Sequence, residues 1–301
     1  MKNQIKPGAM SAMLTPFSED GSVKESAIAE IVDFQIERGL HGLYIGGSTG
    51  EGMMMCAEQR MQVAEATVKA ARGRTQVIIH VGCTDTDTAV QLAKHAKQIG
   101  ANGLSSIPPY YYRHHKDYIK SYYRDVAAAT DLPFLVYHVP SQTVGLTYET
   151  LTELMQLPNV VGMKYTEDNL EVLCKFRQNE GKDCLAFIGH DAMLLAALTE
   201  GATGGIGAFY NVMPQGFADL YDAFTEGRLA DALAEQHRIN FFITMMKKYM
   251  LSGNQVPLKA VMKAYGVDCG IPKRPVPPIS AEAEAALLKE LKDHSYFDIY
   301  R

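Results

Sequence analysis

The chain has 301 residues, 47% of them hydrophobic, and a formal net charge of -5 from 29 basic and 34 acidic residues. It is long enough to bury a large core in one α/β domain or two smaller ones, and its balanced charge argues against a nucleic-acid-binding surface or a polybasic membrane patch. The sequence shows no uninterrupted apolar stretch of signal-peptide or transmembrane length. We therefore expect a soluble, cytoplasmic protein that acts on small molecules.

Short β-rich runs alternate with longer segments that carry apolar residues at three- and four-residue spacing, which is typical of alternating strands and helices. Several runs are apolar on both faces, as in parallel sheets covered by helices. The predicted strands are residues 12–15, 42–45, 76–81, 103–107, 134–137, 160–166, 185–188 and 205–208. Predicted helices between them include residues 25–37, 57–71, 87–99, 116–129 and 148–155.

Eight such units over about 225 residues predict an α/β fold of the closed (β/α)8 TIM-barrel type. A doubly wound open sheet remains the alternative, because alternation alone does not demonstrate closure. No GxGxxG motif follows the first strand, which argues against a dinucleotide-binding form of that alternative.

The pattern changes near the C-terminus, where helices follow one another without strands. We therefore predict a catalytic barrel domain over residues 1–225 and a helical extension over residues 226–301. The lysines Lys259 and Lys273 lie in this extension, and we interpret them as surface or structural residues. The predicted helices are residues 215–226, 229–250, 256–265 and 281–292.

Residues that commonly bind metals are present, but not in a metal-binding pattern. The adjacent histidines His114 and His115 lie in a predicted loop, where such side chains are usually solvated. The cysteines have no CxxC spacing, and we expect reduced, mostly buried thiols. We predict no metal site. The five cysteines are Cys56, Cys83, Cys174, Cys184 and Cys269.

A lysine, Lys164, stands at the end of the predicted strand 160–166, which is otherwise apolar. An unpaired ammonium in such a place costs several kcal/mol in desolvation, which favours the neutral amine. A neutral lysine amine is a nucleophile that forms a Schiff base with a carbonyl carbon. The alternative is a strand-end lysine that extends to solvent.

Polar residues at the carboxyl ends of the other strands are the natural partners of Lys164, because the active site of a parallel barrel lies at that end. The second strand leads into a glycine-rich turn that contains Ser48 and Thr49; it lacks the lysine and spacing of a P-loop, so it suits a small carboxylate better than a triphosphate. Tyr137 ends the strand before that of Lys164, from which its phenol could relay a proton at a Schiff base. For the turn and for Tyr137, a purely structural role is the alternative.

In combination these motifs resemble the dihydrodipicolinate synthase / N-acetylneuraminate lyase family over essentially the whole chain. The matching segments are Gly46-Gly47-Ser48-Thr49-Gly50-Glu51, Pro109-Tyr110-Tyr111, Tyr137-His138-Val139-Pro140, Gly162-Met163-Lys164-Tyr165-Thr166 and Gly204-Gly205-Ile206-Gly207.

The resemblance implies a metal-independent class I aldolase without a cofactor, in which Lys164 forms an imine with pyruvate or another 2-keto acid. It implies that Ser48 and Thr49 hold the pyruvate carboxylate and that Tyr137 transfers the proton between imine and enamine. It also implies a homotetramer built as a pair of dimers, in which Tyr111 passes between neighbouring subunits. The implied catalytic residues are Lys164, Tyr137, Thr49 and Tyr111, and the implied substrate-binding residues are Ser48, Thr49, Gly47, Thr166, Gly189, Asp191, Ile206, Gly207 and Gln142.

The chain departs from the family patterns where the second substrate is expected. Synthases carry an arginine at the position of Gln142, and a neutral amide cannot give its charge-assisted, bidentate contact with aspartate semialdehyde. Sialic-acid lyases carry a second carboxylate at the position of Ala192 and often a serine at that of Ala208. A related keto-sugar-acid aldolase, joining or splitting pyruvate and an aldehyde, fits this mixture best. The alternatives are dihydrodipicolinate synthase with an unusual carboxylate anchor and a non-catalytic keto-acid-binding protein.

Overall fold

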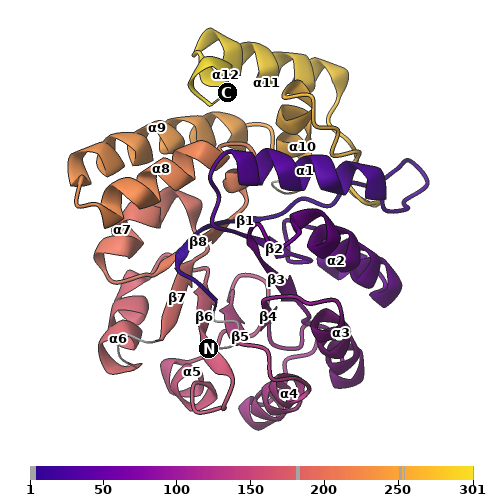
Figure 1. Ribbon diagram of the computed structural model, residues 1–301, viewed down its shortest axis with the longest axis vertical. Helices are drawn as coiled ribbons and strands as arrows, with labels where there is room; N and C mark the ends of the chain where they lie inside the picture. Colours follow the sequence, from indigo (N-terminus) through magenta and orange to yellow (C-terminus); the bar gives the residue numbers. More distant parts are fainter. Residues whose placement is uncertain (1–4, 181–183, 251–252, 254, 301) are drawn as a thin grey trace.

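The computed structural model describes residues 5–180, 184–250, 253 and 255–300, and its strands form one closed parallel barrel (Figure 1). Each strand pairs in parallel with the next, and β8 pairs with β1. This closure confirms the predicted TIM barrel and excludes the open doubly wound sheet. The strands are β1 (Gly8–Ala12), β2 (Gly42–Ile45), β3 (Gln76–His80), β4 (Gly103–Ser106), β5 (Phe134–His138), β6 (Val160–Tyr165), β7 (Leu185–Ile188) and β8 (Gly204–Gly207).

Helices follow the strands and form the outer ring of the barrel, and further helices extend beyond it at the C-terminal end of the chain (Figure 1). The helices of the ring are α1 (Glu25–Glu37), α2 (Ala57–Ala71), α3 (Thr86–Gln98), α4 (Lys116–Ala128), α5 (Tyr148–Leu154), α6 (Leu170–Glu180), α7 (Leu194–Thr199) and α8 (Pro214–Thr225). The later helices are α9 (Leu229–Lys247), α10 (Gln255–Ala264), α11 (Ala281–Asp293) and α12 (Tyr296–Ile299).

The first strand lies earlier than the sequence predicted, at Gly8–Ala12 instead of residues 12–15. Gly8–Ala12 has no β-branched or aromatic residue, so local propensity gives it little strand character. Pairing with β2 and β8 makes it a strand. The more apolar residues that follow form the mouth of the barrel instead, where the Leu14 amide donates to Asn211 Oδ1 at 3.0 Å.

Side-chain alternation along the strands creates two separate apolar cores. One fills the space between the strands and the outer helices and includes Val136 and Tyr165. The other fills the barrel and includes Tyr44, Tyr137 and Phe187. The upper end of this inner core is therefore the floor of any pocket at the carboxyl ends of the strands.

The extension is attached directly to the barrel loops. On α9, Gln236 Oε1 accepts from the Leu195 amide at 2.9 Å and Asn240 Nδ2 donates to the Ala192 carbonyl at 3.1 Å. From α12, the Tyr296 hydroxyl donates to the Val212 carbonyl at 2.6 Å. The loops after β7 and β8 thus depend on helices from the end of the chain.

The burial of the cysteines differs from the expectation. Only Cys83 and Cys269 are buried, so the prediction of mostly buried thiols is wrong. Cys56 is exposed because it directly precedes the surface helix α2. In the part of the chain that the structure describes, no helix has the length and apolar character needed to span a bilayer.

Candidate active site

Lys164 lies on β6 and points into the barrel. Its Cα is in register with that of Tyr137 on β5 and with that of Phe187 on β7. Residues in register on parallel strands share a face, so the strand pairing alone brings the Lys164 amine and the Tyr137 ring together. Only 4% of Lys164 is exposed. The lysine that the sequence singled out is therefore buried and does not extend to solvent.

The amine of Lys164 is held between two aromatic rings. Its Nζ lies 4.2 Å from the ring centroid of Tyr137 and 4.5 Å from that of Tyr44. No ion pair involves Lys164 among the residues that the structure describes. Aromatic faces attract a cation weakly compared with a carboxylate, so this amine remains available for a carbonyl compound.

Uncharged polar groups form the floor beneath the lysine. The Tyr44 hydroxyl donates to Ser105 Oγ at 3.1 Å, and burial raises the pKa of this phenol well above its usual range. Burial, with the nearby Arg60 guanidinium, lowers the pKa of His80 well below its ordinary value. His80 Nε2 accepts from the Ile107 amide at 3.2 Å. The floor therefore contributes fixed dipoles and no countercharge.

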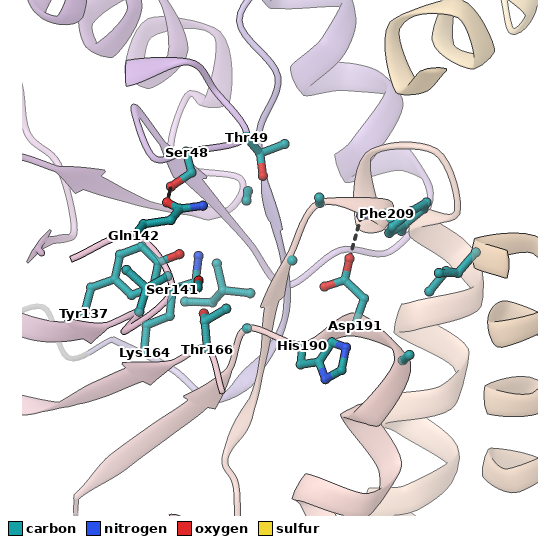
Figure 2. A pocket seen from close by; sticks show the side chains of 18 of the residues that line it. Ser48, Thr49, Tyr137, Ser141, Gln142, Lys164, Thr166, His190, Asp191 and Phe209 are labelled. Carbon is teal, nitrogen blue, oxygen red and sulfur yellow. Dashed lines mark hydrogen bonds between the residues drawn. The ribbon is translucent and has the colours of Figure 1, made fainter. Parts of the chain in front are cut away.

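The glycine-rich turn after β2 brings Ser48 and Thr49 to the opposite side of the pocket (Figure 2). Gly46 takes a positive φ of 71°, a conformation that glycine adopts without steric cost. Ser48 Oγ donates to Gln142 Oε1 at 2.8 Å, which joins the turn to the loop after β5. Two half-buried hydroxyls thus face the lysine across the cavity.

Thr166 and Gly189 form the wall next to Lys164. Thr166 Oγ1 is buried and has no hydrogen-bond partner among the described residues. A Cβ at Gly189 would clash with Thr166 Oγ1 and stand 3.2 Å from Lys164 Cε, so only glycine leaves room for both side chains. Thr166 thereby presents a free hydroxyl to the cavity.

Asp191 lies across the pocket from Lys164 (Figure 2). Its Oδ2 accepts from the Phe209 amide at 2.8 Å, while its Oδ1 has no hydrogen-bond partner within the described ranges. Burial raises the pKa of this carboxyl to about 6, although the Phe209 amide and Lys164 oppose the shift. Asp191 therefore fixes the loop after β8 as well as lining the cavity.

The neighbouring histidines have other partners. His190 Nδ1 lies 2.9 Å from Asp168 Oδ1. His138, next to Tyr137, faces the outer helices: it stacks on Tyr165 with ring centroids 5.0 Å apart, and its Nε2 lies 2.9 Å from Glu167 Oε2. This contact holds β5 and β6 together on their outer side. His138 therefore lies outside the pocket.

These elements enclose a cavity of about 280 Å³, and most of the predicted site residues line it. Gly47 and Tyr111 do not. Gly47 is buried behind the turn, where a Cβ would stand 2.8 Å from the Tyr44 ring. Tyr111 is 86% exposed, has a φ of 78°, and lies outside the cavity of the single chain. The predicted residues in the cavity are Lys164, Tyr137, Ser48, Thr49, Gln142, Thr166, Gly189, Asp191, Ile206 and Gly207.

Several residues that line the cavity were not predicted from the sequence, among them Lys247 and Ile243, which α9 contributes one turn apart. Both come from the helical extension, and no local motif marks them. Lys247 has no ion-pair partner in the described part of the chain. Its charge opposes the burial that raises the pKa of Asp191. The far end of the cavity therefore carries a cation that the barrel motifs do not supply. The other lining residues that were missed are Ala12, Val139, Ser141, His190 and Phe209.

No cluster of three or more histidine, cysteine, aspartate or glutamate side chains suited to a metal ion occurs within the described ranges.

The model of the dihydrodipicolinate synthetase family matches residues 6–294. The chain is 37% identical to the N-acetylneuraminate lyase of Rhizobium meliloti (strain 1021) over 283 residues, which cover 94% of this chain and 93% of that protein. The chain belongs to the dihydrodipicolinate synthetase family. As a member, it is an enzyme of the lyase and aldolase class.

Solved structures of both branches of the dihydrodipicolinate synthetase family resemble this barrel. A catalytic lysine mutant of the Ruminococcus gnavus sialic acid aldolase superposes with a TM-score of 0.92 at 26% identity, covering 98% of this chain and 99% of that one. The dihydrodipicolinate synthase of Aquifex aeolicus superposes with a TM-score of 0.89 at 28% identity, covering 96% of this chain and 98% of that one. Overall shape does not separate the two branches.

Proposed function

We propose that this protein is a pyruvate-dependent aldolase that uses Lys164 as a Schiff-base nucleophile and acts on a 2-keto sugar acid. The observation that carries the proposal is the unpaired Lys164 amine, buried in the cavity, with the Tyr137 ring against it and the Ser48 and Thr49 hydroxyls across from it. The related aldolase solved as a catalytic lysine mutant supports this role for the lysine.

In the cleavage direction, Lys164 Nζ attacks the keto carbon of the substrate, and the carbonyl oxygen leaves as water when the imine forms. Loss of the C4 hydroxyl proton breaks the bond between C3 and C4 and releases the aldehyde. The electron pair of that bond passes to the protonated imine and gives an enamine. Protonation of C3 and hydrolysis then release pyruvate and restore the free lysine. Synthesis follows the same steps in reverse.

Within this scheme each group has one task. Ser48 and Thr49 hold the carboxylate of the keto acid, and Tyr137 transfers the proton between the substrate hydroxyl, the imine and the enamine. The protonated imine draws electrons from the breaking bond, so the chemistry requires neither a metal ion nor another cofactor. The polar floor under Lys164 supports this assignment because it contains no competing carboxylate.

The polar lining of the cavity favours a sugar-derived keto acid over aspartate semialdehyde. Gln142 offers an amide where a synthase needs a cation to hold the semialdehyde carboxylate, while Thr166, Asp191 and Lys247 offer groups that bind hydroxyls. The similarity to an N-acetylneuraminate lyase supports the lyase branch. Since Ala192 and Ala208 replace polar groups expected of sialic-acid lyases, we favour a shorter sugar acid than sialic acid.

The proposal includes a cytoplasmic homotetramer built from two dimers. Tyr111 is exposed outside the cavity of its own chain, and the neighbouring Tyr112 is also exposed. A tyrosine in this position can contribute to catalysis only when another subunit covers it. Sedimentation or light scattering of the purified protein would establish the assembly.

The proposal is tested by incubating the protein with pyruvate and borohydride, which reduces an imine to a stable secondary amine. We expect a mass increase on Lys164 and none in Lys164→Ala. A screen of 2-keto-3-deoxy sugar acids and N-acetylneuraminate for pyruvate release, with Lys164→Ala as the blank, then identifies the substrate. An unchanged mass contradicts the mechanism, and turnover only of pyruvate with aspartate semialdehyde contradicts the substrate class.

A further inference from the structure

A fully buried ion pair lies behind the turn that carries Ser48 and Thr49. Lys259 Nζ, from α10, is 2.7 Å from Glu51 Oε1, and the two side chains are 3% and 0% exposed. In the sequence, most of the barrel lies between Glu51 and Lys259. Lys259 therefore links the C-terminal extension to the start of the chain at the edge of the active site.

Glu51 ends the turn in a backbone conformation that is unfavourable for a residue with a side chain. Its backbone takes a left-handed conformation with φ of 58°, and its amide donates to the Ser48 carbonyl at 3.1 Å. Its Oε2 accepts from the Lys273 amide at 2.6 Å. A positive φ is unfavourable for a residue with a side chain, so surrounding contacts have to stabilise it. Those contacts come from the extension.

Lys259 is anchored on its own side as well. Its Nζ donates to the Ile271 carbonyl at 2.6 Å and lies 5.0 Å from the centroid of the Phe17 ring. Burial lowers the pKa of Lys259, and the Glu51 carboxylate opposes that shift. A buried pair of this kind often adds little net stability, whereas removal of one partner leaves a costly unpaired charge. The ion pair between Lys259 and Glu51 can therefore contribute more to the geometry of the turn than to the stability of the fold.

We propose that Lys259 is a positioning residue for the carboxylate-binding turn, acting through Glu51 to hold the Ser48 and Thr49 hydroxyls toward Lys164. The inference rests on the proposed function, because it assumes that these hydroxyls bind the carboxylate of a keto acid. It makes the helical extension part of the substrate site, although Lys259 itself touches no substrate.

The test compares Lys259→Met with the matched control Lys263→Met. Lys263 lies one turn later on α10, is exposed, and pairs with Glu284 at 3.0 Å on the surface. A third variant, Glu51→Gln combined with Lys259→Met, removes both charges and keeps an acceptor for the Lys273 amide. For each protein we would measure the pyruvate concentration that gives half-maximal borohydride trapping on Lys164, together with the thermal unfolding temperature.

We expect Lys259→Met to need about 10- to 100-fold more pyruvate, because small displacements of a binding group reduce productive binding by such factors. Saturating pyruvate should still trap Lys164 fully. The double variant should regain the unfolding temperature, because no unpaired buried charge remains, but its affinity should stay weakened, because the link from Lys259 to the turn is still absent. Lys263→Met should match the unchanged protein.

Two results would overturn the inference: half-maximal trapping of Lys259→Met at the same pyruvate concentration as Lys263→Met, with only the unfolding temperature lowered, or an affinity of the double variant equal to that of Lys263→Met. If Lys259→Met does not fold, the double variant decides: affinity well below that of Lys263→Met supports the inference, and affinity equal to that of Lys263→Met contradicts it. Absence of any adduct in the unchanged protein would instead refute the proposed function.

Discussion

Lys164 Nζ lies 4.2 Å from the centroid of the Tyr137 ring, and the two residues are in direct register across β5 and β6. Strand pairing fixes their backbones, and the stacked pair of His138 and Tyr165 locks the same two strands from the outer side. The relative position of amine and phenol is therefore set by the barrel itself and does not depend on a mobile loop.

We predict that Tyr137→Phe retains imine formation but loses turnover. The phenylalanine ring still covers Lys164, while the hydroxyl that transfers the proton is absent. General acid–base catalysis contributes about 10²- to 10⁴-fold, and we expect kcat for pyruvate release to fall within this range. Steady-state kinetics and borohydride trapping on the same sample measure the two steps separately. Tyr118→Phe, at an exposed tyrosine on α4, is the control. A kcat equal to that of the control would remove Tyr137 from the proton transfer.

Gly189→Ala should prevent the lysine from reacting. The new methyl group would clash with Thr166 Oγ1 and press on Lys164 Cε, and overpacking of this kind costs about 1–3 kcal/mol of stability. We expect a lower unfolding temperature and loss of borohydride trapping. Thr166→Ala in the same chain removes the clashing oxygen and should restore part of the trapping. Full trapping in Gly189→Ala alone would show that the wall is more adaptable than the close packing indicates.

Most of the fold could be predicted because its elements have regular periodicity. The helices at Glu25–Glu37 and Ala57–Ala71 and the strand Leu185–Ile188 have the predicted bounds. Strand β1 could not be placed from Gly8–Ala12 alone, because small residues give no strand signal and its two neighbours in the barrel specify it.

The residues of the candidate site also fall into two groups, those that the sequence predicts and those that it does not. Lys164, Tyr137 and Ser48 lie at or just after the carboxyl ends of their strands. A parallel barrel brings all of these carboxyl ends to one rim, so the order of the strands in the sequence sufficed to group the three residues. Lys247 and Lys259 lie on α9 and α10, far from any motif. Lys259 is buried against Glu51 rather than at the surface, and only tertiary packing shows that a lysine in a helical tail has this partner.

Gln142→Arg should shift the preference for the second substrate toward anionic aldehydes. A guanidinium can form charge-assisted hydrogen bonds with a carboxylate, which are worth about 1.5–3 kcal/mol or about 10- to 100-fold in kcat/KM. The substitution also removes the acceptor of Ser48 Oγ, so we expect weaker pyruvate binding. The measurement is kcat/KM with pyruvate for aspartate semialdehyde and for a neutral aldehyde of similar size. Gln142→Met, which removes the same acceptor without adding charge, isolates the effect of the cation. Equal changes for both aldehydes would mean that residue 142 does not face the second substrate.

Asp191→Asn should change how stability depends on pH. Because the pKa of Asp191 is raised from 3.8 to about 6 by burial, the folded protein binds a proton more strongly than the unfolded chain does between these values. The stability contribution of this group is therefore fully present below the unfolded pKa and is lost as pH rises through the folded pKa. Asparagine does not titrate, so the free energy of unfolding of Asp191→Asn, relative to the unchanged protein, should increase by up to about 3 kcal/mol from about pH 4 to about pH 7. Urea unfolding of both proteins across this range measures the difference, and other titrating groups cancel because the two chains share them. A difference that stays constant with pH would mean that the Asp191 carboxyl keeps its ordinary pKa, which requires water or a further donor at Oδ1.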